Sequence, residues 1–258
     1  MEKSDTPLRV NLEADGRLLR LTLARPKQNI VDSAMLAAMR AALAAHQQTR
    51  ALAAVLIDAD GPNFSFGASV EEHLPERCGA MLKSLHGLIL DMIAFPLPIL
   101  VAVRGYCLGG GLEVACAGSF IYAAPDAQFA QPEIQLAVFA PAASCLLPER
   151  MGQARAEDIL FSGRIMDAVE ALEAGLVHAI SAEPERAARH YIETQLLTRS
   201  TFALRHAVAA ARTGYLERVR KKLDSVEKLY LEQLMLGADP KEGLSAFLQK
   251  REPVWKNQ

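Results

Sequence analysis

Two glutamates stand in apolar surroundings, where an ionised carboxylate is costly unless it is paired or used in chemistry. Glu113 is followed by the apolar residues 114–117, and Glu133 stands between Pro132 and Ile134. Two carboxyl groups that share a dry pocket repel each other, so that one tends to keep its proton while the other ionises. This asymmetry suits general acid–base catalysis. The spacing alone leaves a second interpretation open, in which both are surface glutamates at helix starts.

A run of three glycines, Gly109 to Gly111, follows the apolar residues 98–103 and precedes Glu113. Glycines between a strand and a helix permit close backbone approach, and the helix N-terminus adds available N–H groups and positive potential. The run lacks the G-x-G-x-x-G spacing of dinucleotide-binding loops and the Lys-Ser/Thr pair of a P-loop. We expect these N–H groups to bind an anion or a developing oxyanion. The alternative is that the glycines serve only the tight packing of the helix on the strand.

A second glycine segment, residues 64–72, contains Gly67 and Ala68 and comes after the apolar run 54–57. Two such loops, each placed after a buried strand, can direct two backbone N–H groups at one carbonyl oxygen. This arrangement predicts an oxyanion hole. His73 follows the segment at no spacing that pairs it with another catalytic group, so we expect a solvated or hydrogen-bonded histidine there.

The elements that carry these loops indicate an α/β fold. Residues 19–23 alternate in polarity like a half-buried strand, and Asp32 is a candidate N-cap of a helix. The apolar runs 54–57 and 98–103 predict strands buried on both faces, so parallel pairing is expected. After about residue 183 the strand pattern stops, and four helices are predicted over residues 185–199, 202–214, 217–236 and 240–251. We therefore expect a core over residues 1–190 and a helical region over residues 191–258.

The composition narrows the class of protein. The 258 residues include 28 Lys and Arg and 30 Asp and Glu, for a net charge of −2, and 51% are hydrophobic. A soluble globular protein has this balance, and it lacks the basic excess that binds nucleic acid. Residues 1–5 are charged and lead into no apolar segment, and the longest apolar stretch falls short of the ~20 residues that span a membrane. We expect a cytoplasmic protein with no membrane partner and four reduced, buried cysteines. No metal is expected, because the histidines are scattered.

Three segments together resemble the enoyl-CoA hydratase/isomerase (crotonase) superfamily. They are Phe-x-x-Gly-Ala at residues 64–68, Gly-Tyr-x-Leu-Gly-Gly-Gly-x-Glu at 105–113, and Gln-Phe-x-Gln-Pro-Glu-Ile at 128–134. The resemblance extends from about Leu18 to residues 243–251, which is nearly the whole chain. It implies a right-handed spiral of ββα units followed by C-terminal helices that mediate trimer formation. The implied assembly is a homotrimer or a homohexamer.

The resemblance also implies roles for individual residues. Ala68 and Gly110 would donate backbone N–H groups to the oxygen of an acyl-CoA thioester. Glu113 and Glu133 would be the two catalytic carboxylates of a hydro-lyase. The thioester would bind along four consecutive residues, Ala68, Ser69, Val70 and Glu71. No cofactor is implied, because CoA is part of the substrate, and the choice of acid and base between the two glutamates stays open.

Two departures from the straight-chain hydratases bear on the substrate. Ser69 stands where those enzymes usually have Asp, and residues 137–145 replace a glycine-rich turn. Phe139 in this segment offers a flat apolar wall for a ring. These features are similar to the branch of the family that hydrates cyclic dienoyl-CoA thioesters in anaerobic benzoyl-CoA degradation.

Two alternatives stay open at this point. A general short-chain enoyl-CoA hydratase would use the same two glutamates. A binding protein that kept the fold without catalysis would be a protein of another class, in which the basic residues 218–222 contact nucleic acid. That cluster is more typical of a solvated helix face, because Val219 and Leu223 supply its apolar side.

Overall fold

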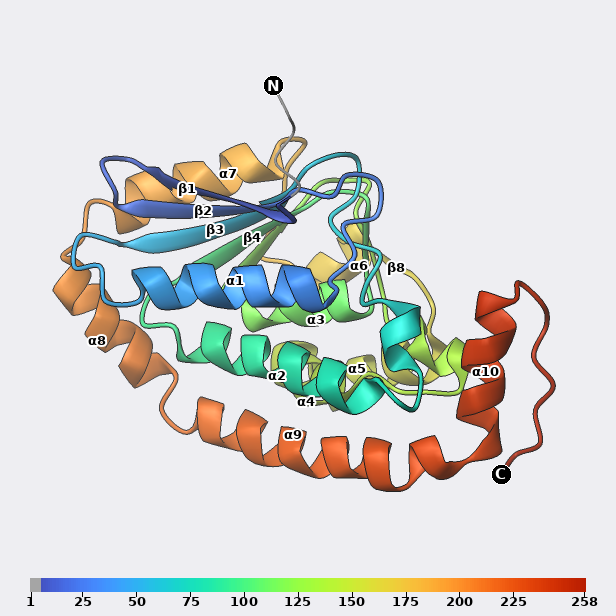
Figure 1. Ribbon diagram of the computed structural model, residues 1–258. Helices are drawn as coiled ribbons and strands as arrows, with labels where there is room; N and C mark the ends of the chain where they lie inside the picture. The colour runs from blue at the N-terminus through green and yellow to red at the C-terminus, as the bar shows by residue number, and fades with distance from the viewer. Residues whose placement is uncertain (1–5) are drawn as a thin grey trace.

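Two β-sheets organise residues 6–258, the part of the chain that the computed structural model describes, and residues 1–5 with their charged start lie outside it. The larger sheet has six strands in the order β1-β2-β3-β4-β6-β9 (Figure 1). Its strands are β1 (Leu8–Glu13), β2 (Leu18–Leu23), β3 (Ala54–Ala59), β4 (Ile99–Val103), β6 (Phe120–Ala123) and β9 (Ala179–Ile180). The smaller sheet consists of β5 (Tyr106–Leu108), β7 (Gln128–Ala130) and β8 (Met166–Asp167).

Parallel pairing dominates the larger sheet, as the apolar runs of the sequence predict. Strands β2, β3, β4, β6 and β9 pair in parallel, and β1 alone among the strands of this sheet pairs antiparallel, with β2. Every residue of β4 is buried, because the sheet is covered on both faces. One glycine loop follows β3 of this sheet, and the other follows β5 of the smaller sheet.

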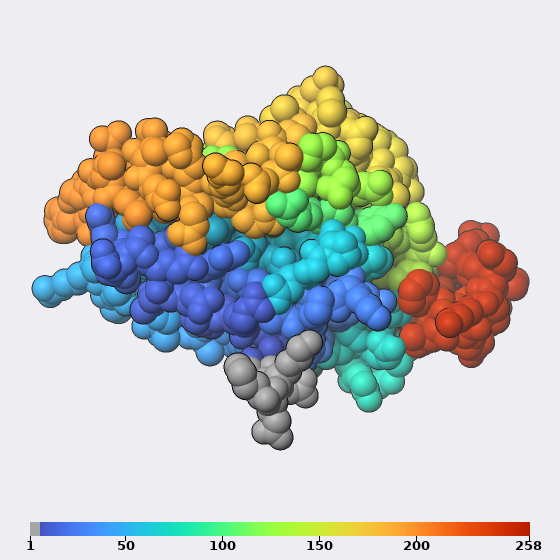
Figure 2. Space-filling model, turned by 90° about the horizontal axis from the view of Figure 1, so that it is seen from above, coloured from blue at the N-terminus to red at the C-terminus, as the bar shows by residue number. Residues whose placement is uncertain are grey.

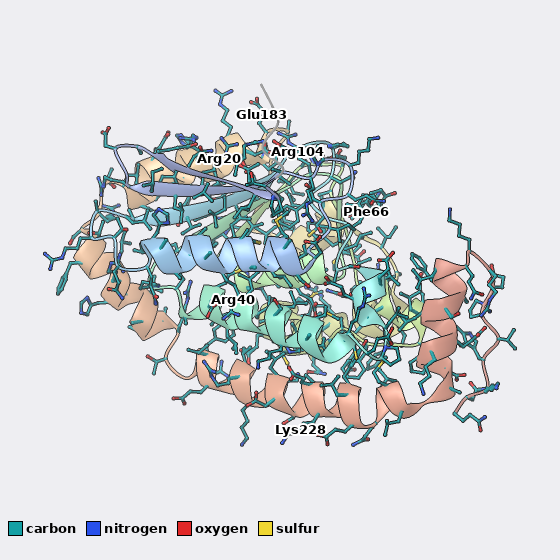
Figure 3. All side chains as sticks on the ribbon, in the orientation of Figure 1. Arg20, Arg40, Phe66, Arg104, Glu183 and Lys228 are labelled. Carbon is teal, nitrogen blue, oxygen red and sulfur yellow. The ribbon has the colours of Figure 1, made fainter. Side chains whose placement is uncertain are left out.

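Helices cover both faces of the larger sheet (Figure 1). One face carries α1 (Ser33–His46), α2 (Cys78–Ala94) and α3 (Gly110–Ala117), and the other carries α7 (Pro184–Tyr191). Asp32 caps α1 as predicted, because its carboxylate accepts a hydrogen bond from the Met35 N–H at 2.9 Å. Arg40 of α1 pairs with Asp91 of α2 at 2.6 Å and joins the two helices (Figure 3).

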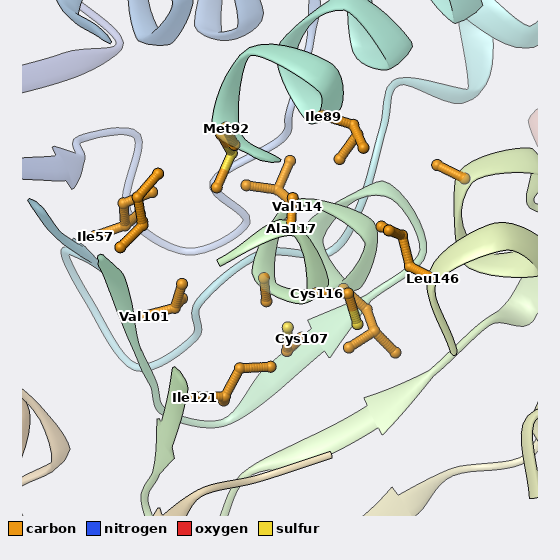
Figure 4. Close-up of a cluster of buried hydrophobic side chains, with 14 of the residues drawn as sticks. Ile57, Ile89, Met92, Val101, Cys107, Val114, Cys116, Ala117, Ile121 and Leu146 are labelled. Carbon is orange, nitrogen blue, oxygen red and sulfur yellow. The ribbon is translucent and has the colours of Figure 1, made fainter. Parts of the chain in front are cut away.

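The core surrounds α3, the helix that follows the three glycines. All eight residues of α3 are buried, Glu113 among them. Apolar side chains from the larger sheet, α2 and α4 (Pro141–Met151) enclose it (Figure 4), among them Ile57, Ile89, Met92, Val101, Ile121 and Leu146. The four cysteines are free and buried, as expected. A helix packed on all sides holds its carboxylate in a fixed place.

One segment differs from the sequence-based expectation. The sequence predicts a turn over residues 137–145, but helix α4 begins within them. Proline is favoured at the first position of a helix, where its missing N–H is not needed. The short helix η2 (Pro132–Leu136) comes before and ends at Ala137 in a left-handed conformation (φ 55°). The remaining elements of this part are η1 (Val70–His73), α5 (Gln153–Ser162) and α6 (Ala168–Glu173).

The regular elements after residue 183 of the described chain are all helices, as predicted. After α7 and a π-helical turn, η3 (Ile192–Leu196), come α8 (Thr201–Ala211), α9 (Tyr215–Glu232), η4 (Leu234–Leu236) and α10 (Ala238–Leu248). Helix α9 runs along α2 and α4, and α10 lies against η2 at one end of the molecule (Figures 1 and 2). The division of the chain at residue 190 stays a prediction.

Candidate active site

The two glycine loops lie in direct contact. The Leu108 N–H donates to the Ser65 carbonyl at 3.0 Å, which joins the loop after β3 to β5. A Cβ atom placed on Gly110 would lie 3.1 Å from the Ala68 nitrogen, and one on Gly67 would lie 3.1 Å from the Leu108 carbonyl oxygen. Gly67 also has φ +104°, which side chains rarely adopt. Glycine at both positions lets the two loops close on each other.

The backbone amides of Ala68 and Gly110 are brought together by this contact. Among residues 6–258, neither N–H is paired with an acceptor, whereas the neighbouring Gly109 N–H donates to the Ala130 carbonyl at 3.0 Å and the Gly67 N–H donates to Ser65 Oγ at 3.1 Å. Gly110 is also the first residue of α3, so the helix N-terminus adds positive potential. The pair is arranged to bind one oxygen that carries partial negative charge.

Glu113 projects from the first turn of α3 and is 3% exposed. Its Oε1 accepts a hydrogen bond from the Ala143 N–H at 2.7 Å, at the start of α4. Burial raises the pKa of Glu113 to about 7, while the amides of Ala143 and Ala142 act in the opposite direction. The N-terminus of α4 thus favours the ionised form of a carboxyl group that burial disfavours. The two residues are 30 positions apart, and no local pattern in the sequence predicts this contact.

Glu133 lies in η2 and reaches the same glycine turn. Its Oε1 would be 2.5 Å from a Cβ on Gly109, a residue with φ +49°, so only glycine leaves room for the carboxyl group. Burial, and to a lesser degree the charge of Glu113, raise the pKa of Glu133 to about 8. The structure therefore places both predicted glutamates at one turn, in electrostatic contact.

Gln131 is a further polar group at this site, buried and 1% exposed. With its amide nitrogen toward Glu133, it donates to Oε2 at 2.9 Å and to Oε1 at 3.2 Å. With the amide reversed, Nε2 donates to the Gly109 carbonyl at 3.4 Å and the amide oxygen faces the Glu133 carboxyl group. The first orientation fits ionised Glu133 and the second fits protonated Glu133. In the sequence, only its position next to Pro132-Glu133 indicates that Gln131 belongs to the site.

The segment that follows Ala68 borders a surface groove. Ser69 Oγ donates to Glu71 at 2.8 Å, and the His73 ring nitrogen lies 2.7 Å from the Ser69 carbonyl oxygen. His73 is thus a hydrogen-bonded histidine, one of the two states expected. The groove has a volume of about 750 Å³, and residues 25–32 and 69–77 supply its lining. On the outside of the loop, Phe66 packs on the Tyr106 ring at 5.2 Å (Figure 3).

Phe139 forms part of an apolar wall with the C-terminal helices. Its half-buried ring meets the ring of Tyr230 on α9 at 5.3 Å and 74°. Tyr230 belongs to a buried cluster that includes Cys78 and Val138, and Phe139 and Val70 pack against this cluster. The sequence does not identify Tyr230 as a residue of the site. It falls on the buried side of the predicted helix with Val219 and Leu223, and that position was its only signal in the sequence.

The basic residues 218–222 stand away from these groups. Arg218 pairs with Glu149 at 3.0 Å, while Val219 is buried, which fits the solvated helix face considered for this cluster. Within residues 6–258, no three His, Cys, Asp or Glu side chains are grouped so that they could hold a metal ion. No helix in the described part of the chain has the length and apolar character to cross a membrane.

Comparisons with known proteins agree with this geometry. The family described as enoyl-CoA hydratase/isomerase matches residues 13–258. The chain is 59% identical over 257 residues to the cyclohexa-1,5-dienecarbonyl-CoA hydratase of Thauera aromatica, and the match covers 100% of both chains. It is 31% identical to a probable enoyl-CoA hydratase of Rhizobium meliloti, over 95% of this chain and 97% of that one. A crystal structure of an enoyl-CoA hydratase/isomerase from Pseudoalteromonas atlantica is similar with a TM-score of 0.84 at 29% identity, covering 96% and 99% of the two chains.

Proposed function

Because the chain belongs to the enoyl-CoA hydratase/isomerase family, we propose that it adds water to cyclohexa-1,5-diene-1-carbonyl-CoA, as the name of the Thauera aromatica relative states for that protein. The observation that carries the proposal is the 59% identity to that relative over the full length of both chains. The product is 6-hydroxycyclohex-1-ene-1-carbonyl-CoA, an intermediate that belongs to anaerobic benzoyl-CoA degradation. The enzyme is a hydro-lyase.

The thioester carbonyl oxygen binds the N–H groups of Ala68 and Gly110 in this proposal. Attack of water at the β-carbon sends electrons into the conjugated system and builds negative charge on this oxygen. Donors already held in place stabilise that charge without reorganisation, and the loss of one such donor typically costs about 2.7–4 kcal/mol. The contact between the two glycine loops supports this assignment.

Glu113 acts as the base and Glu133 as the acid. The Ala143 N–H stabilises the carboxylate of Glu113, whereas burial and the Glu113 charge keep the proton on Glu133. Glu113 takes a proton from water as the oxygen–carbon bond forms at the β-carbon. Glu133 then gives its proton to the far γ-carbon of the extended enolate, which makes the net reaction a 1,4-addition.

The CoA portion lies in the groove beside Ser69 and Glu71. Lys27 and Arg77 line this groove and offer cationic groups to phosphates, while Arg25 in the same lining pairs with Asp32. The thioester end then reaches Ala68 along the stretch 68–71. The reaction uses no metal. It needs no further cofactor, because CoA is part of the substrate.

The assembly is a homotrimer or a homohexamer in the cytoplasm. Apolar side chains that are exposed in the single chain support association, and those of the C-terminal part include Leu236, Phe247 and Val254. The role of the C-terminal helices in trimer formation is implied by the family.

The test is product identification by mass spectrometry and NMR after incubation with the cyclic dienoyl-CoA, with crotonyl-CoA as the parallel substrate. We expect the hydroxylated cyclohexene thioester as product and a higher kcat/KM for the cyclic diene. Hydration of crotonyl-CoA with no product from the cyclic diene would instead establish a general enoyl-CoA hydratase.

A further inference from the structure

Tyr230 carries a buried polar group that has no role in the proposed mechanism. Its side chain on α9 is 0% exposed, and its hydroxyl has no hydrogen-bond partner among residues 6–258. An unpaired hydroxyl in an apolar interior costs free energy, so native proteins rarely keep one without a reason. A ligand that brings its own polar atom would supply the missing partner.

The Tyr230 hydroxyl is close enough to the two catalytic carboxyl groups for their charges to act on it. The Tyr230 ring packs edge-on against Phe139, the residue expected to form the wall of the acyl pocket. Burial raises the pKa of Tyr230, and Cys78, Glu133 and Glu113 raise it further. The hydroxyl therefore stays neutral and can donate and accept hydrogen bonds, but it does not serve as a base.

The chemistry of the acyl group limits which polar atom could bind the Tyr230 hydroxyl. A cyclic dienoyl thioester has one oxygen in its acyl part, and the N–H groups of Ala68 and Gly110 bind that carbonyl oxygen. Hydration adds one more oxygen, at the ring. No other polar atom of the acyl group remains for a hydroxyl at the apolar wall.

Resting on the function proposed above, we propose that the Tyr230 hydroxyl binds the oxygen that is added to the ring. In the forward direction this oxygen belongs to the attacking water, and in the reverse direction it is the hydroxyl group of the hydrated thioester. Tyr230 orients that oxygen, while the proton of the water still passes to Glu113. A helix from the C-terminal part of the chain thereby completes the active site.

The experiment compares two CoA thioesters with the same cyclohexene ring, one with the hydroxyl group and one without it. Affinities are measured by calorimetry in the Glu113→Gln background, which prevents turnover. Tyr230→Phe removes the hydroxyl and keeps the ring on Phe139. We expect about a three- to tenfold weaker binding of the hydroxylated thioester and unchanged binding of the other one, the range that one hydrogen bond gives.

Tyr122→Phe in the same background is the matched control, because Tyr122 is a buried tyrosine on β6 that packs in a different cluster. It should change neither affinity. With Glu113 present, Tyr230→Phe should lower kcat for the cyclic diene with little change in KM. Its melting temperature should equal or exceed that of the parent, because an unpaired hydroxyl is lost.

Equal loss of affinity for both thioesters, or no loss for either, would overturn the inference about Tyr230. If the parent enzyme hydrates the cyclic diene, the proposed function stands in spite of that outcome. If the parent gives no product from the cyclic diene, the proposed function fails and the inference falls with it.

Discussion

Glu113 and Glu133 are residues of the same type, but their different surroundings favour different protonation states. Glu113 accepts a hydrogen bond from a helix N-terminus, whereas Glu133 faces the buried Gln131 and the charge of Glu113. The charge of Glu113 acts on Glu133, so their protonation states are linked. Gln131 stands next to Pro132-Glu133 in the sequence, but Ala143, whose N–H binds Glu113, lies 30 residues further along the chain.

Removal of either carboxyl group tests the residue roles. We expect Glu113→Gln and Glu133→Gln each to lower kcat by at least about a hundredfold, since general acid–base groups contribute about 10²–10⁴-fold. Affinity for the substrate thioester should change little, because the amide keeps the shape of the side chain. Single-turnover kinetics and calorimetry measure the two quantities. Near-normal turnover in one variant would remove that residue from the mechanism.

The linked pair also predicts a bell-shaped pH profile. The active form carries ionised Glu113, whose pKa is about 7, and protonated Glu133, whose pKa is about 8. Activity should fall below about pH 7 as Glu113 takes up a proton, and fall above about pH 8 as Glu133 loses one. The dependence of kcat/KM on pH measures both limbs. A value of kcat/KM that stays constant from about pH 5 to about pH 10, a range that covers the pKa values of both glutamates, contradicts the assignment.

At the scale of elements, the start of α4 acts on catalysis through its backbone. Ala143→Pro deletes the N–H that donates to Glu113 and places proline in the first helical turn, where it is tolerated. The pKa of Glu113 should rise, so the acidic limb of the pH profile should move to higher pH. The basic limb, which belongs to Glu133, should move less.

Ser144→Ala is the control for Ala143→Pro. Ser144 Oγ donates to the Ala140 carbonyl within α4, so its removal touches the same helix start without the Glu113 contact. The control should keep the acidic limb in place. Equal shifts in both variants would show that the helix start acts through general distortion.

The wall at Phe139 is expected to select for a ring. Phe139→Leu shortens the wall and leaves the Ala143 N–H in place. We expect kcat/KM for the cyclic diene to fall at least about tenfold, in line with other pocket substitutions, and activity on crotonyl-CoA to fall less. Both rates measured side by side give the ratio. Equal losses on the two substrates would mean that Phe139 has no part in ring specificity.

The sequence predicted elements well where the signal is local. The parallel strands, the Asp32 cap and the four C-terminal helices follow from periodicity and capping. The start of α4 was missed because Pro141 can end a loop as readily as begin a helix. The contacts of Ala143 and Tyr230 were not predictable, since each joins residues that only tertiary packing brings together.

At the scale of the whole molecule, the exposed apolar side chains point to association. Phe247, Val254 and Leu236 are 54%, 70% and 72% exposed and follow α9, at one end of the molecule (Figure 2). A second set in α5 and α6 includes Phe161 and Val169, at 69% and 58% exposure. Two separate apolar sets suit an assembly with two kinds of interface, one that forms trimers and one that pairs them.

This arrangement gives a prediction about assembly. Light scattering after size-exclusion chromatography should give a mass of three or six chains for the parent protein. Phe247→Glu places a charge in the set that follows α9, where we expect the trimer contact, so the variant should run as single chains. Phe161→Glu should leave trimers intact, because its set serves at most the pairing of trimers. If Phe247→Glu keeps the parent mass and Phe161→Glu gives single chains, the trimer contact lies at α5 and α6, and the C-terminal helices serve the active site of their own chain alone.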